Sequence, residues 1–136
     1  MGRRKSDMKE TCFDVIGVGA CAIDYLGIVP EFPEPDTKNR IKKLIRQGGG
    51  PVATALVCLS RLGSKTCFLG KLGDDELSSF VLDDFVREGV DVKNVIREQG
   101  AGPLFAFVIV DEKEGKRTIW WTDENVYPLR PNEVKA

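Results

Sequence analysis

Histidine is absent from the 136-residue sequence. This absence excludes catalytic triads that rely on an imidazole base and removes most zinc sites from consideration. The four cysteines show no CxxC spacing, and each lies in or beside an apolar run: Cys12, Cys21, Cys58 and Cys67. Because no signal peptide precedes them, this pattern favours buried free thiols over disulfides.

The sequence also lacks a long apolar run and a charge excess of either sign. No run approaches the ~20 apolar residues of a membrane-spanning helix, so we expect a cytoplasmic protein without a membrane partner. The net charge is -1, and the charges are interspersed except for the basic cluster at residues 3–5. This distribution is not that of a nucleic-acid-binding protein. Residues 1–11 are predicted to form a disordered tail, and residues 12–136 to belong to one domain.

The central feature is a glycine turn that leads into an apolar helix. Glycines at 48–50 allow close backbone approach, Pro51 presets φ for the first helical turn, and Gly63 ends the apolar run. We expect a buried helix whose first amide groups can hold a ligand hydroxyl or an anion. From the glycines alone, a tight turn before a core helix is an equal alternative.

The flanking segments predict an α/β arrangement. Apolar and β-branched residues indicate short buried strands over 13–19, 66–72 and 90–96. The helix between the first two makes them a parallel pair. Asp74 is predicted to cap a second amphipathic helix, which ends at Gly89.

A competing motif lies at the end of the first strand. Gly17-x-Gly19-x-x-Ala22 matches the dinucleotide-binding fingerprint, which must open a helix directly after a strand. The residues that follow, 23–29, are rich in β-branched side chains and lead to Pro30. They favour a second extended segment, and the nucleotide interpretation is accordingly the weaker one.

The spacing Gly49-Gly50, three residues, Thr54, and then Arg61-Leu62-Gly63 resembles the N-terminal signature of the PfkB (ribokinase-like) carbohydrate kinases. Most of that family has Asn where this chain has Thr54. The resemblance covers nearly the whole chain from Phe13. It implies an α/β, ribokinase-like fold, a Rossmann-like parallel sheet with helices, of which the chain forms the N-terminal part.

The resemblance also implies a small β lid over a sugar, built from about residues 21–47 and 102–122. The second segment holds a predicted hairpin, with strands over 104–110 and 117–122. Trp120 and Trp121 are adjacent in it and must point to opposite faces of a strand. We therefore expect one of them to face a substrate, a lid partner or a second subunit.

The implied substrate-binding residues are Asp24, Gly49, Gly50 and Thr54. Asp24 resembles the family's aspartate that binds sugar hydroxyls, and its two oxygens can accept hydrogen bonds from adjacent hydroxyl groups. A turn carboxylate is the alternative role for this residue. No catalytic residue and no metal ligand is assigned within the chain.

The implied reaction is transfer of the γ-phosphoryl group of ATP to a sugar hydroxyl, with Mg²⁺ neutralising phosphate charge. The family's Gly-Ala-Gly-Asp motif, which supplies the catalytic base and an anion hole, does not occur in this sequence. We expect it and most of the ATP site in a missing C-terminal half, without which the chain is inactive. The alternative is a non-catalytic sugar-binding or assembly module, including a homodimer through the lid strands.

Overall fold

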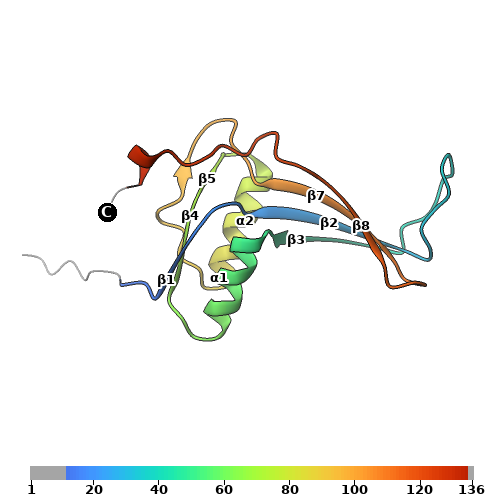
Figure 1. Ribbon diagram of the computed structural model, residues 1–136, viewed down its shortest axis with the longest axis horizontal. Coiled ribbons are helices and arrows are strands. Elements are labelled where there is room, and N and C mark those ends of the chain that lie inside the picture. The colour runs from blue at the N-terminus through green and yellow to red at the C-terminus, as the bar shows by residue number, and fades with distance from the viewer. Residues whose placement is uncertain (1–11, 135–136) are drawn as a thin grey trace, which may run out of the picture.

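The computed structural model describes residues 12–134, so the predicted disordered tail over residues 1–11 lies outside the described residues. Figure 1 shows two parts, a helical part on short strands and a long sheet that reaches away from it. The elements are β1 (Val15–Val18), β2 (Ala22–Val29), β3 (Lys43–Gly49), α1 (Pro51–Arg61), β4 (Thr66–Leu69), β5 (Lys71–Leu72), α2 (Glu76–Arg87), β6 (Ile96–Arg97), β7 (Leu104–Asp111), β8 (Arg117–Thr122) and the 3-10 turn η1 (Pro131–Glu133).

The short strands pair in parallel, β1 with β4 and β5 with β6, which confirms the predicted α/β arrangement. The strand predicted over 66–72 is interrupted at Gly70, where an added Cβ would lie 2.4 Å from the Phe68 ring. The strand predicted over 90–96 is wrong for most of its length. Asp91 forms only an isolated bridge to Cys67, and a turn closed by Val95 N–H and the Val92 carbonyl precedes β6.

The long sheet has the order β3-β2-β7-β8. β2 pairs antiparallel with β3 and parallel with β7, and β8 pairs antiparallel with β7. The two segments assigned to the lid thus supply all four strands of one sheet. Because β2 follows β1 without a helix, the extended-segment prediction is confirmed, and the Gly17-x-Gly19 motif lacks the helix that a dinucleotide site requires.

Helix α1 begins where the sequence predicts, with Pro51 in its first turn and Gly50 as N-cap. The prediction that it is buried is only half right. Ala53 and Leu56 are buried, whereas Thr54, Ala55 and Cys58 are exposed. Helix α1 contacts β1 and β4 through one face, so its opposite face is exposed to solvent.

Helix α2 is capped by Asp75 and not, as the sequence predicted, by Asp74. The Asp75 carboxylate accepts hydrogen bonds from the Ser78 backbone N–H at 2.8 Å and the Ser78 hydroxyl at 2.9 Å. The Ser78 hydroxyl oxygen also accepts from Gly73 N–H at 3.1 Å. The Ser78 hydroxyl thus adds a second hydrogen bond to the cap at Asp75, which Leu77 could not give to a cap at Asp74.

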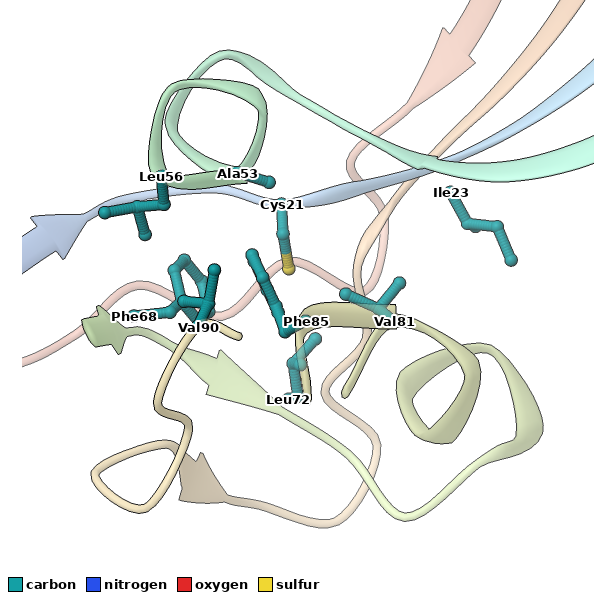
Figure 2. Packing of buried hydrophobic residues seen from close by; sticks show 9 residues of the cluster. All are labelled: Cys21, Ile23, Ala53, Leu56, Phe68, Leu72, Val81, Phe85 and Val90. Atoms are coloured by element: carbon teal, nitrogen blue, oxygen red, sulfur yellow. The ribbon is translucent and has the colours of Figure 1, made fainter. Parts of the chain in front are cut away.

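The core lies between α1, α2 and the short strands (Figure 2). Phe68 and Phe85 stack at its centre with ring centroids 4.8 Å apart. All four cysteines are free, as predicted, but only Cys21 and Cys67 are buried, while the other two are exposed. Burial raises the pKa of Cys21 to about 12, so this thiol stays protonated at neutral pH.

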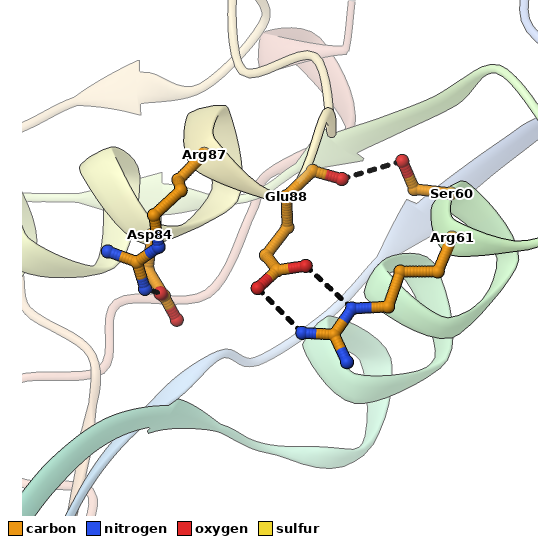
Figure 3. Close-up of polar contacts among 5 residues, drawn as sticks. All are labelled: Ser60, Arg61, Asp84, Arg87 and Glu88. Carbon is orange, nitrogen blue, oxygen red and sulfur yellow. Dashed lines mark hydrogen bonds and ion pairs between the residues drawn. The ribbon is translucent and has the colours of Figure 1, made fainter.

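Polar contacts join the ends of the two helices (Figure 3). The Arg61 guanidinium donates two 2.7 Å hydrogen bonds to the Glu88 carboxylate, and the Ser60 hydroxyl donates to the Glu88 carbonyl. Arg87 forms an ion pair with Asp84 on α2 itself. Both arginine side chains are largely exposed, so their ion pairs add little to the free energy of unfolding. Their effect is to hold the ends of the helices in place.

The last described segment is anchored through Lys71, whose side chain is almost fully buried. Its ammonium group pairs with Glu133 at 2.8 Å and Glu98 at 2.6 Å, and these carboxylates raise the pKa of Lys71. Glu133 belongs to η1, and its carboxylate also accepts a 2.7 Å hydrogen bond from the Arg130 backbone N–H. In the described part of the chain, no helix has the length and apolar character required to cross a bilayer.

Candidate functional site

Asp24 lies within strand β2, between Gln47 of β3 and Ala106 of β7. The alternative role as a turn carboxylate is therefore wrong. The side chain is half-buried, and this burial raises the pKa of Asp24 above its ordinary value. Within residues 12–134 the carboxylate has no hydrogen-bond or ion-pair partner, so both of its oxygens are available to hydroxyl donors.

Gly49 provides the space in which the Asp24 carboxylate lies. A Cβ built on Gly49 would come within 2.3 Å of Asp24 Oδ2 and 3.0 Å of Oδ1. Gly49 is paired with Ala22, two residues before Asp24, so it is the diagonal neighbour of Asp24 on the same face of the sheet. The structure thus brings together two of the predicted site residues.

Gly50 turns the chain from β3 into α1. Its φ of 91° lies in the left-handed region that favours glycine, and an added Cβ would meet the Ala22 backbone N at 3.0 Å. No side chain caps the helix, and the first intrahelical bond runs from Thr54 N–H to the Gly50 carbonyl. The amides of Val52 and Ala53 are therefore left without an intrahelical acceptor.

Thr54 is exposed on the first turn of α1. Together with Gly49 and Gln47 it lines a cavity of about 310 Å³ between the end of β3 and the two helices. Asp24 and Gly50 do not line this cavity, so the four predicted residues form a chain of neighbours around Gly49 and not the wall of one enclosed space.

Two further residues at this site escaped the sequence analysis. Gln47 is exposed and lies directly opposite Asp24. Its spacing of two from Gly49 is a usable signal, because alternate residues of a strand share a face. Asp84 of α2 lies where a Cβ on Gly48 would come within 2.3 Å of its Oδ2. No local pattern connects Asp84 with the glycines, since they are more than 30 residues apart.

In residues 12–134, no group of three or more cysteine, aspartate or glutamate side chains is arranged to hold a metal. Magnesium at kinase sites is typically held by one or two carboxylates together with water and the phosphates of the nucleotide.

The fold defines the class of protein, an α/β protein with the ribokinase fold, because the solved structures that match this chain share it. A fructokinase from Xylella fastidiosa is 25% identical, with a TM-score of 0.69 over 89% of this chain and 36% of its own. A fructokinase structure from the same organism with bound ATP is 27% identical with a TM-score of 0.61, over 79% of this chain and 32% of its own.

Residues 13–135 match the pfkB family of carbohydrate kinases, and the chain belongs to that family. Mouse ketohexokinase is 34% identical over 82% of this chain and 38% of its own length. A nucleoside kinase from Methanothermobacter thermautotrophicus is 33% identical over 72% of this chain and 32% of its own. The chain thus spans about a third of the length of such relatives.

Proposed function

We propose that this chain forms the sugar-recognition part of an ATP-dependent carbohydrate kinase, which transfers a γ-phosphoryl group to a sugar hydroxyl. The observation that carries the proposal is the unpartnered Asp24 carboxylate held against Gly49. Two adjacent sugar hydroxyls can each donate to one carboxylate oxygen. Such charge-assisted hydrogen bonds are stronger than neutral ones in a half-buried site.

The free amides at the start of α1 and the Thr54 hydroxyl extend this donor and acceptor set. Val52 and Ala53 offer backbone N–H groups to a ligand oxygen, and Thr54 offers one hydroxyl that both donates and accepts. A polyhydroxylated ligand matches this arrangement, because each hydroxyl can donate to Asp24 or accept from the helix. The proposed site residues remain Asp24, Gly49, Gly50 and Thr54.

The proposed phosphoryl donor is ATP with Mg²⁺, bound outside these 136 residues together with the catalytic base. The limited share of the relatives' length and the absence of a Gly-Ala-Gly-Asp motif support this division. ATP is a cytoplasmic metabolite, so we propose a cytoplasmic location. The sheet β3-β2-β7-β8 acts as a lid, whose closure over the sugar excludes water that would compete for the phosphoryl group.

A second candidate is a non-catalytic sugar-binding or assembly module that pairs with another copy through the same sheet. The observation that favours it is the edge strand β8, in which every residue is exposed, including Ile119 at 46% and Trp120 at 52%. An exposed apolar edge strand is a surface on which a second chain can pair. A kinase can use this sheet both as a lid and as a dimer contact. A non-catalytic module would form the dimer but would not phosphorylate a sugar.

ATP consumption with a panel of sugars separates the two candidates. We expect sugar-dependent turnover from the full-length gene product and none from the 136-residue chain alone. Light scattering on the full-length product measures the homodimer, which we expect at twice the monomer mass. The module would be established instead if the full-length product binds sugar, never consumes ATP and contains no Gly-Ala-Gly-Asp motif.

Thr54→Asn tests the position at which this chain departs from most of the family. Asparagine offers an amide donor and a carbonyl acceptor where threonine offers one hydroxyl, so we expect the ranking of kcat/KM across the sugar panel to change. Thr54 is exposed, so the melting temperature should stay within a few degrees. An unchanged ranking with a changed melting temperature would show that Thr54 only packs in the helix.

A further inference from the structure

We propose that Trp121 is a second sugar-contacting residue, whose indole packs on the C–H face of the sugar ring that Asp24 holds by its hydroxyls. This inference rests on the proposed function and adds a specificity-determining residue to it. The ligand class is a cyclic sugar, which presents hydroxyls at its edge and apolar C–H groups on its face.

The strand register places Trp121 and Asp24 on one face of the sheet. Asp24 is paired with Ala106 of β7, and Ala106 is paired with Trp121 of β8. Directly paired residues of neighbouring strands point to the same face. Gln47, paired with Asp24 on its other side, completes a row across all four strands.

The spacing along this row suits one sugar ring. Neighbouring strands lie about 4.8 Å apart, so the backbones of Asp24 and Trp121, two strands apart, are separated by roughly 10 Å. The residue between them is Ala106, which is 8% exposed and carries only a methyl group, a much smaller side chain than those of Asp24 and Trp121. The row therefore places a carboxylate and an indole on either side of one small residue.

Trp121 is free to contact a ligand, and its neighbour Trp120 is not equivalent to it. Trp121 is 66% exposed, and among the described residues no aromatic ring packs on its indole. Trp120 is paired with Phe107 on the opposite face, and it stacks with Phe32 at a centroid distance of 6.3 Å. An exposed, unstacked indole beside an unpartnered carboxylate offers both kinds of contact that a sugar needs.

The test uses Trp121→Ala, Trp121→Phe and the matched control Trp120→Ala in the full-length gene product. Sugar affinity is measured by titration calorimetry with a panel of cyclic sugars, and molecular mass by light scattering. We expect Trp121→Ala to weaken sugar binding about tenfold, Trp121→Phe to retain most of it because an aromatic face remains, and Trp120→Ala to bind as the wild type does.

Each outcome bears on the inference. Equal sugar affinity in Trp121→Ala and the wild type overturns it, and a lower mass in that variant then assigns Trp121 to the contact between copies. Equal losses in Trp121→Ala and Trp120→Ala also overturn it, because they report damage to the hairpin. Asp24→Asn in the same assay isolates the proposed function. If Asp24→Asn binds sugar as the wild type does, the proposed function itself is wrong. If Asp24→Asn loses sugar affinity while Trp121→Ala keeps it, only the role of Trp121 is wrong.

Discussion

Replacing Asp24 with asparagine should remove most of the sugar affinity of the full-length gene product and leave its ATP affinity unchanged. The carboxylate has no protein partner in the described residues, so its hydrogen-bonding capacity is left for the ligand. Hydrogen bonds to a charged group contribute about 1.5–3 kcal/mol, which corresponds to a loss of roughly ten- to a hundredfold in affinity. Calorimetric titration with sugar and, separately, with ATP measures both quantities.

The same substitution should make the unliganded protein more stable at neutral pH. Desolvation raises the pKa of Asp24 in the folded state above its value in the unfolded chain. The folded state therefore binds the proton more tightly, and the stability of the wild type falls as pH rises through the interval between the two pKa values. Asparagine carries no charge. The free energy of unfolding of Asp24→Asn should therefore exceed that of the wild type above this pH interval, and the difference should vanish below the pKa of Asp24 in the unfolded chain.

Asp123→Asn is the matched control, since it makes the same change of charge at an exposed position just after β8. It should alter neither sugar affinity nor melting temperature. Thermal unfolding of both variants at pH 7 and at pH 3 gives the comparison. Asp24→Asn with wild-type sugar affinity would remove Asp24 from the site, and a lower melting temperature at pH 7 would show that the carboxylate stabilises the fold.

Local signals in the sequence predict the centre of the molecule well. Pro51 and the glycine before it mark the start of α1, because each has a backbone preference that is independent of the rest of the chain. The hairpin of β7 and β8 is similarly local, since a polar turn with Gly115 joins two apolar strands. These elements form for reasons contained within a few residues, so a pattern search can find them.

The remaining features depend on contacts between distant residues. The parallel pairing of β2 with β7 brings Asp24 beside Ala106, and no local pattern encodes a partner some 80 residues away. The row that includes Trp121 follows from this register, so the sequence identifies the tryptophan pair but not which member shares a face with Asp24. The cap at Asp75 likewise includes a hydrogen bond from the Ser78 hydroxyl, a contact that a rule for single residues does not consider.

Substituting the two adjacent glycines should separate the site from the fold. In Gly49→Ala the new Cβ conflicts with the Asp24 carboxylate, at 2.3 Å from Oδ2. That carboxylate is the end of a side chain, which can rotate away, so we expect little loss of stability and a loss of sugar affinity comparable to that of Asp24→Asn. The paired substitution Gly50→Ala meets backbone, with Ala22 N at 3.0 Å and the Ala20 carbonyl oxygen at 3.2 Å.

Gly50→Ala must also adopt a φ of 91°, which an L-residue reaches at a cost of about 1–2 kcal/mol. We therefore expect the melting temperature of Gly50→Ala to be clearly lower than that of the wild type, and the melting temperature of Gly49→Ala to be close to it. Gly27→Ala is the control within β2, because its Cβ meets only side-chain carbons, with Ile109 Cδ1 at 3.2 Å and Ile41 Cδ1 at 3.5 Å. Thermal unfolding and sugar titration of the three variants measure both effects. A melting temperature of Gly49→Ala well below that of the wild type, or a sugar affinity equal to that of Gly27→Ala, would show that Gly49 is needed for the turn and not for the position of the Asp24 carboxylate.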